Sequence, residues 1–261
     1  MKKLIALLLT LAMMLALVAC VKPDNKPDDG NKPGDGTTET PDTGDTDDGD
    51  TDGELSVMTY EEYVAAELQS EVLVEVYVQA HQAWWFNSKV NHGVITVYAA
   101  DHDGGYFLYE MECAEEDAAK LVPGTKILVH GIKAEWAGEI EIIEATFEFV
   151  DDAPYIAEAV NLTDLLGSEI LISFQNQYAL FEGLTVVSIE YQNGAPGKDI
   201  YVKLSLNGIE YSFCVESYLT SPGSDLYKAV EELKAGDVID VTGFVYWYEG
   251  VNTHITGITV K

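Results

Sequence analysis

Hydrophobic and polar residues alternate along much of the chain beyond residue 70, and this pattern predicts ten β-strands in two groups of five. The first group is formed by residues 72–78, 93–99, 106–113, 125–134 and 139–149. The second group is formed by residues 178–190, 199–206, 210–216, 237–248 and 251–260. These runs are rich in β-branched and aromatic residues and most are bounded by turn-forming residues, as half-buried strands are.

Four other segments have the character of helices. Residues 59–69 open on Thr59 with Glu62 three positions later, which is the pattern of a capping box. Residues 114–121 and 224–233 fall between the third and fourth strand of each group, and residues 156–177 are expected to supply a lead-in helix to the second group. Each half therefore has the order β-β-β-α-β-β after a short lead-in helix.

One sequence pattern occurs twice and supports this division. The segment 121–131 reads LVPGTKILVHG and the segment 233–243 reads LKAGDVIDVTG. Five positions agree at one constant offset, and a tryptophan follows each copy, Trp136 in the first and Trp247 in the second. Two copies at domain-sized spacing predict two small domains of one type, with boundaries at 55–152 and 153–261.

The predicted strand order resembles that of the OB-fold, a five-stranded Greek-key barrel with a helix between strands three and four. Over residues 59–261 the chain is similar to the tandem OB-like modules of extracytoplasmic lipoproteins from gut-type Gram-positive bacteria. The resemblance implies a mostly β protein made of two tandem barrels. OB-folds serve many functions, so the resemblance does not identify a ligand.

The amino-terminal residues resemble the signal peptide and lipobox of bacterial lipoproteins. Two lysines precede an apolar run that ends in Leu17-Val18-Ala19-Cys20. The resemblance implies cleavage before Cys20, lipidation of Cys20 and anchoring on the extracytoplasmic face of the cell membrane of a Gram-positive cell. A plain secretory signal is the alternative. Residues 21–54 are polar and acidic, and we expect a disordered linker there.

Charge narrows the possible partners. The chain has 45 Asp and Glu residues against 14 Lys, contains no Arg, and carries a formal net charge of −31. Arg and Lys supply much of the affinity for nucleic acid through phosphate contacts, so we expect no nucleic acid as a partner. The sequence thus favours a non-catalytic binding or scaffold protein of the cell envelope, with a glycan or a protein as the possible ligand. The alternatives are a carbohydrate-binding accessory to a secreted hydrolase and a nucleic-acid-binding OB module.

Catalytic motifs are absent from the sequence, so we expect neither enzymatic activity nor a cofactor. Aromatic residues provide the main functional candidates, because OB-folds hold ligands between the loop after strand one and the loop between strands four and five. The candidate ligand-binding residues are Trp84, Trp85, Phe86, Asn87, Trp136, Trp247 and Tyr248. Because Trp136 and Trp247 recur in both copies, packing at the barrel end is an alternative role for this pair.

Histidines and cysteines supply weaker candidates. His81 and His92 stand at the ends of the first two strands, where they could face each other and bind zinc if a carboxylate joined them. An isolated surface histidine is the commoner case. Cys113 and Cys214 end the third strand of each group, and we expect buried free thiols, with a disulfide between the domains as the alternative.

Overall fold

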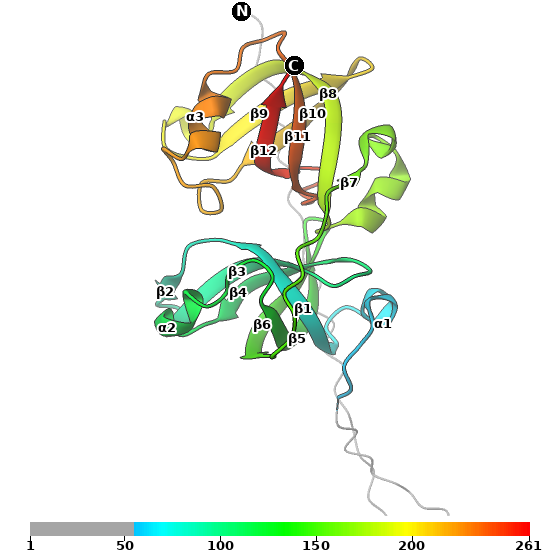
Figure 1. The fold of residues 1–261 in the computed structure, drawn as a ribbon, viewed down its shortest axis with the longest axis vertical. Coiled ribbons are helices and arrows are strands. Elements are labelled where there is room, and N and C mark those ends of the chain that lie inside the picture. The colour runs from blue at the N-terminus through cyan, green and yellow to red at the C-terminus, as the bar shows by residue number, and fades with distance from the viewer. Residues whose placement is uncertain (1–54) are drawn as a thin grey trace, which may run out of the picture. The chain divides into compact units, whose positions relative to one another are not determined.

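Two five-stranded β-barrels make up most of the computed structural model, which describes residues 55–261 (Figure 1). The predicted signal peptide, the predicted lipidation site Cys20 and the predicted acidic linker lie outside the described residues. Within the described part, no helix combines the length and the apolar character needed to cross a membrane. Residues Asp52–Lys261 belong to one unit, so both barrels lie within the same body.

The first barrel has the strand connectivity of an OB-fold. Its strands are β1 (Glu71–His81), β3 (His92–Ala100), β4 (Gly105–Glu112), β5 (Lys126–Trp136) and β6 (Glu139–Phe149). The hydrogen-bonded order is β1-β5-β6-β4-β3, and the pairing of β1 with β3 closes the barrel. β4 and β6 run parallel and all the other pairs are antiparallel. The short helix α2 (Glu115–Ala118) lies between β4 and β5, and the extra strand β2 (Trp85–Asn87) pairs with the start of β3.

The second barrel repeats this plan. Its strands are β8 (Tyr178–Tyr191), β9 (Ile200–Leu206), β10 (Ile209–Val215), β11 (Val238–Phe244) and β12 (His254–Val260), with α3 (Asp225–Glu231) between β10 and β11. β11 pairs with both β8 and β12, and β10 runs parallel to β12. The prediction of two tandem OB-type barrels is therefore confirmed.

The repeated sequence pattern occupies equivalent places in the two barrels. Ile127 and Val129 lie on β5, Ile239 and Val241 lie on β11, and each of these strands is the fourth of its barrel. All four side chains are fully buried. The repeat therefore records the inward-facing positions of one strand, which alternate with outward-facing ones.

The lead-in segments differ between the barrels. Before the first barrel, α1 (Tyr60–Ala65) begins with the predicted capping box of Thr59 and Glu62. Before the second, the expected helix over 156–177 is absent. In its place are the two-residue strand β7 (Val160–Asn161), which pairs with β8, and two 3-10 helices, η1 (Thr163–Leu165) and η2 (Glu169–Phe174). Gly167 separates them with a φ of +86°, a conformation that interrupts an α-helix.

The fourth strand of the second barrel is shorter than predicted. β11 ends at Phe244, and residues 245–253 form a loop in which a single bridge joins Trp247 to Val251.

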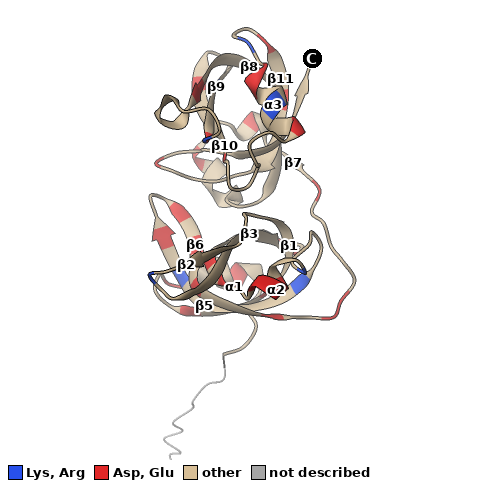
Figure 2. Ribbon diagram, turned by 90° about the vertical axis from the view of Figure 1, so that its left-hand side faces the viewer, with Lys and Arg blue, Asp and Glu red and all other residues tan. Residues whose placement is uncertain are grey.

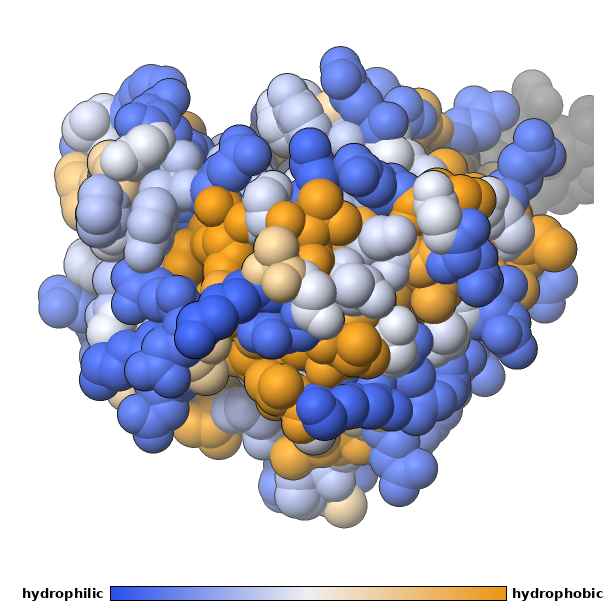
Figure 3. All heavy atoms as spheres, turned by 90° about the horizontal axis from the view of Figure 1, so that it is seen from above, coloured by the Kyte–Doolittle hydropathy of each residue, from blue (hydrophilic) through white to orange (hydrophobic). Residues whose placement is uncertain are grey.

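A third 3-10 helix, η3 (Gln192–Gly194), lies between β8 and β9. Large hydrophobic side chains such as Val238 and Val260 remain exposed on the second barrel. Seen from above, hydrophobic residues gather in the middle of the surface and hydrophilic ones surround them (Figure 3).

Candidate functional site

The loops that join strands four and five of the two barrels contact each other. The backbone N–H of Glu249 donates to the carbonyl oxygen of Ala137 at 2.8 Å, and the backbone N–H of Trp247 donates to Oε2 of Glu139 at 2.7 Å. The Trp247 indole lies so close to Gly138 that a Cβ there would come within 2.8 Å of Cδ1. The two ligand-type loops of this OB pair thus form a junction between the barrels.

Aromatic side chains fill the rest of the junction. Tyr98 of the first barrel stacks on Phe244 of the second, with ring centroids 4.3 Å apart and planes 6° from parallel. The Tyr98 hydroxyl is 2.9 Å from Nδ1 of His254, and Phe107 packs edge-on against Tyr246. Tyr98, Phe107 and Phe244 are all buried, so the contact is a small hydrophobic core in its own right.

A cleft of about 830 Å³ opens beside this core. Its floor is the β9–β10 surface of the second barrel, which is the strand-two and strand-three face that OB-folds use for ligands. The loop 245–253 borders the cleft on one side and residues of the first barrel border it on the other. Seven aromatic rings line it: Phe107, Tyr109, Trp136, Tyr201, Tyr211, Tyr246 and Tyr248.

The charged lining of the cleft is of one sign. Asp199, Glu210, Glu216 and Glu249 line it, and no Lys is among the lining residues. Figure 2 shows acidic residues spread over both barrels, with few basic ones among them. The cleft therefore combines ring faces, which carry negative quadrupole potential, with carboxylates, and both attract cations.

Burial changes the acid–base properties of several groups around the junction. Desolvation raises the pKa of Glu139 to about 8 and that of Glu216 to about 7. Desolvation also lowers the pKa of His254 to about 4, so this imidazole is neutral at physiological pH and can accept a hydrogen bond from the Tyr98 hydroxyl. Burial likewise raises the pKa of the Cys214 thiol.

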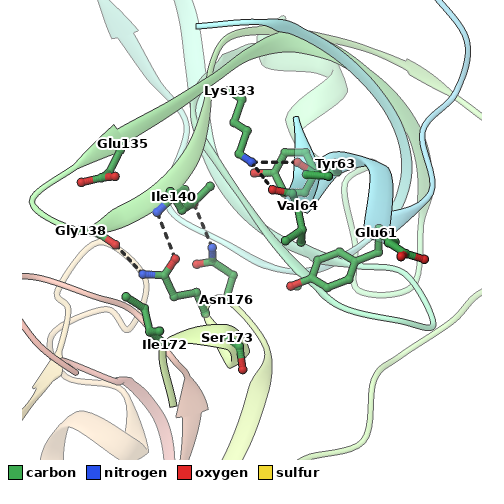
Figure 4. A pocket seen from close by; sticks show the side chains of 14 residues that line it. Glu61, Tyr63, Val64, Lys133, Glu135, Gly138, Ile140, Ile172, Ser173 and Asn176 are labelled. Carbon is green, nitrogen blue, oxygen red and sulfur yellow. Dashed lines mark hydrogen bonds between the residues drawn. The ribbon is translucent and has the colours of Figure 1, made fainter. Parts of the chain in front are cut away.

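A second pocket, of about 730 Å³, lies where α1 approaches the β5–β6 turn and η2 (Figure 4). Its wall includes Val64, Ile140 and Ile172, so it is mainly apolar. Lys133, which is buried, donates hydrogen bonds to the carbonyl oxygens of Tyr63, Val64 and Ala66 at the end of α1. The three N–H groups of the Lys133 ammonium are all used in these bonds, so Lys133 holds α1 on the barrel.

The structure places the residues of the aromatic loop in different environments. Trp84 is half-buried over Gly93 and its Nε1 donates to the carbonyl oxygen of Cys113 at 2.9 Å. Trp85 and Phe86 are 45% and 53% exposed, and neither lines the cleft. Asn87 is buried, and its side-chain amide donates to Glu110 at 2.8 Å.

The other three aromatic candidates lie at the junction. Trp136 and Tyr248 come from different barrels, lie with ring centroids 5.2 Å apart, and both line the cleft. Trp247 packs against Gly138 and contacts the core of the second barrel. Tyr201 and Glu210 on the cleft floor were not predicted, although their outward positions on the second and third strands of an OB-fold could have identified them. Tyr211 also lines the cleft, but it lies on the opposite side of its strand from Glu210 and packs against the core of the second barrel.

The histidine and cysteine candidates are separated. His81 pairs with Val97 across β1 and β3, whereas His92 pairs with Asn87, so the two histidines do not face each other as we expected. Among residues 55–261 no group of three or more His, Cys, Asp or Glu is placed to hold a metal ion. Cys113 and Cys214 are buried free thiols.

Several solved structures are similar to this chain. A murine DNA-binding protein bound to double-stranded DNA shares 12% sequence identity at a TM-score of 0.35, over 72% of this chain and 94% of that one. The p204 HINb domain matches at 12% identity and a TM-score of 0.35, over 75% of this chain and 100% of that one. A replication protein A heterotrimer bound to single-stranded DNA matches at 14% identity and a TM-score of 0.32, over 74% of this chain and 49% of that one. No protein-family model and no curated protein matches the chain.

Two predictions from the sequence are wrong in light of these matches. We predicted a scaffold or binding protein of the cell envelope with a glycan or protein ligand, and we expected no nucleic acid. Some of the matching structures are instead described as complexes with double-stranded or single-stranded DNA. At 12–14% identity the likeness shows the fold alone, so the chemistry of a ligand has to come from this chain's own side chains.

Proposed function

We propose that this chain is an OB-type binding module that holds a polyamine-like organic cation in the cleft at the barrel junction. The observation that carries the proposal is the lining of that cleft, which combines aromatic rings with carboxyl groups, holds no Lys, and has His254 as its one imidazole, kept neutral by burial that lowers its pKa to about 4. A cation placed over a Tyr or Trp ring gains about 0.5–2 kcal/mol, depending on how well it is desolvated. Several rings and carboxylates along one cleft suit a ligand with several charged nitrogens.

The positions of individual residues support a ligand of this kind. Trp136 and Tyr248 are 54% and 48% exposed, so their faces are open to a ligand although they lie beside each other. Glu210 stands on β10 with its side chain exposed and lines the cleft. Carboxylates that border aromatic faces strengthen the attraction for an ammonium group and repel phosphate.

Calorimetric titration of the full chain with spermidine tests the proposal. Tri(ethylene glycol), a neutral chain of comparable length, is the matched control for the ligand. Glu210→Gln and Tyr248→Leu should each weaken spermidine binding about fivefold, and binding should weaken as salt is added. Glu190→Gln removes one exposed charge of β8 outside the cleft and should change the affinity little. Equal binding of the neutral chain, or affinity unaffected by both cleft variants, would refute the proposal.

Single-stranded nucleic acid is the second candidate, and the rings on the OB ligand face favour it. Unpaired bases stack on aromatic side chains with about 1–3 kcal/mol per base. The carboxylates of the cleft repel phosphate, so binding of an oligothymidylate should require magnesium. Ordinary single-strand binding proteins behave differently, because their affinity rises as salt is removed. Tight binding of the oligonucleotide without magnesium, abolished by Tyr248→Leu, would favour nucleic acid over the organic cation.

The lipid anchor is a separate proposal from the sequence alone. The motif Leu17-Val18-Ala19-Cys20 predicts that the mature chain starts at a diacylglyceryl Cys20. Mass spectrometry of the amino-terminal peptide from the native host should show this modification. An unmodified amino terminus would refute the anchor without affecting the proposal for the cleft.

A further inference from the structure

Two buried carboxyl groups, one from each barrel, accept hydrogen bonds from the opposite barrel. Glu139 of the first barrel accepts a hydrogen bond from the backbone N–H of Trp247 in the second, at 2.7 Å. Glu216 of the second barrel accepts one from Nε2 of Gln82 in the first, at 3.1 Å. Glu139 is fully buried and Glu216 is 9% exposed, and neither forms an ion pair with a residue of the described part. Ionising either group therefore places an uncompensated negative charge between the barrels.

The two carboxyls differ in how well their ionised forms are satisfied. Glu216 also accepts from the backbone N–H groups of Tyr218 and Leu219, so both of its oxygens have donors. Oε1 of Glu139 is buried and has no hydrogen-bond partner. A buried carboxylate oxygen without a donor is costly, whereas a protonated carboxyl leaves less polarity unsatisfied. Glu139 is thus the group whose neutral form fits the closed junction.

No cation faces Glu139; the Trp247 N–H and the side-chain amide of Asn176 favour its ionised form, but desolvation outweighs them. Glu141 on the same strand and the tyrosine hydroxyls of Tyr63, Tyr98 and Tyr246 are the titratable groups that interact with it. None of them is a cation. The buried Lys133 of β5 gives its N–H groups to the carbonyl oxygens of α1.

The groups around Glu216 and the nearby imidazole follow the same pattern. Asp199 and Cys214 interact with Glu216, and both add negative charge when they ionise. His254 could become a cation, but it is buried, accepts from Tyr98 and keeps a low pKa of about 4. It is neutral over the pH range in which Glu139 titrates.

We propose that the barrel junction is proton-linked: it is closed while Glu139 is protonated and opens when Glu139 loses its proton. Opening separates the loop 245–253 from the β5–β6 turn and lets water reach the carboxylate. Because the walls of the cleft come from both barrels, the cleft is then taken apart. The link itself needs no ligand, so it stands independently of the proposed function.

The direction and size of the effect follow from the proton balance. Burial raises the pKa of Glu139 from 4.5 to about 8, so the closed form binds the proton more tightly than an open form with the carboxyl in water. The stabilisation of the closed form is complete below about pH 4.5 and is lost as the pH rises through about 8. The closed-to-open ratio should fall by up to about a thousandfold between pH 5 and 9.

Amide hydrogen exchange at Trp247 in the full chain measures this ratio at the contact itself. After correction for the base catalysis of exchange, protection of the Trp247 N–H should fall by up to about ninetyfold between pH 6 and 9. In Glu139→Gln, whose amide oxygen can still accept from Trp247, protection should stay level. Glu216→Gln, which neutralises the better-satisfied carboxyl, should keep the fall seen in the unmodified chain.

Two results would overturn the proposal. One is protection of Trp247 in the unmodified chain that does not change with pH, and the other is a fall in Glu139→Gln as large as in the unmodified chain. If Glu139→Gln does not fold, the unmodified protein still decides the question by carbon-13 titration of its side-chain carboxyls. A Glu139 carboxyl that titrates below about pH 5.5 would show that its proton does not control the junction.

Discussion

Trp84 and Trp85 are neighbours in sequence, yet the structure predicts different consequences for their removal. Trp84 packs over Gly93 and donates from Nε1 to the Cys113 carbonyl, which ties β2 and the preceding loop to the end of β4. Trp85 points its ring outward and is 45% exposed. Replacing each by alanine therefore separates a packing role from a surface role at adjacent positions.

The magnitude follows from what each substitution removes. Truncation of a buried aromatic residue costs about 3–5 kcal/mol, and because Trp84 is half-buried the lower end applies, about 3 kcal/mol for Trp84→Ala. Trp84→Phe keeps much of the ring but loses the hydrogen bond to Cys113, which should cost about 1 kcal/mol. Trp85→Ala removes a ring whose outer face is already in water, and the loss should stay below about 1 kcal/mol.

Urea denaturation of the full chain and the three variants, followed by far-ultraviolet circular dichroism, measures these differences. The midpoint should fall in the order Trp85→Ala, Trp84→Phe, Trp84→Ala, at an unchanged slope with urea concentration. A loss below about 1 kcal/mol for Trp84→Ala, or equal losses for the two alanine variants, would contradict the packing described for this loop.

Three further predictions test the junction and its supports. Gly138→Ala adds a Cβ 2.8 Å from the Trp247 ring at a φ of +92°, whereas the Cβ of Gly236→Ala meets open space at a φ of +96°. Both variants should lose about 1 kcal/mol of stability to backbone strain, and only Gly138→Ala should also reduce the protection of the Trp247 amide in hydrogen exchange. Lys133→Met takes the ammonium donor away from the carbonyls of Tyr63, Val64 and Ala66, of which only Tyr63 still accepts from a backbone N–H, that of Ala66, and should lower the free energy of unfolding by about 2 kcal/mol. The exposed Lys120→Met should cost less than about 0.5 kcal/mol, and equal losses in a urea titration would refute the role given to Lys133. Thermal unfolding should show the greatest stability at about pH 5–6. The contribution of Glu139 to stability declines as the pH rises through about 8, and that of His254 declines as the pH falls through about 4. A melting temperature that does not change from pH 6 to 9 would contradict the burial of Glu139.

The barrels could be predicted from sequence because their cores leave a local signal. Alternate burial at Val72, Val74 and Val76 on β1, or at Ile127 and Val129 on β5, is visible as a period of two. The duplication gave each weak pattern a second instance, and the strand order of both halves followed. The segment before β8 escaped prediction because short 3-10 helices have no distinctive periodicity.

The junction between the barrels is less evident from the sequence. β3 is buried on both faces from Val94 to Ala100, and that stretch reads VITVYAA, an almost unbroken apolar run typical of a strand covered on two sides. That run could have indicated a second layer over the first barrel, although not which residues supply it. Glu139, between a glycine and an isoleucine in a tight turn, has the sequence context of an exposed residue. The approach of Asn176 and of Trp247, more than a hundred residues away, makes it a buried one.

The stacked pair of Tyr98 and Phe244 has a practical consequence for dissecting this protein. Cutting the chain between its barrels would expose a flat apolar ring on each product, together with Phe107 on the first. Newly exposed apolar patches of this kind favour self-association. Each half made alone should accordingly form dimers or aggregates, and binding studies need both barrels in one polypeptide.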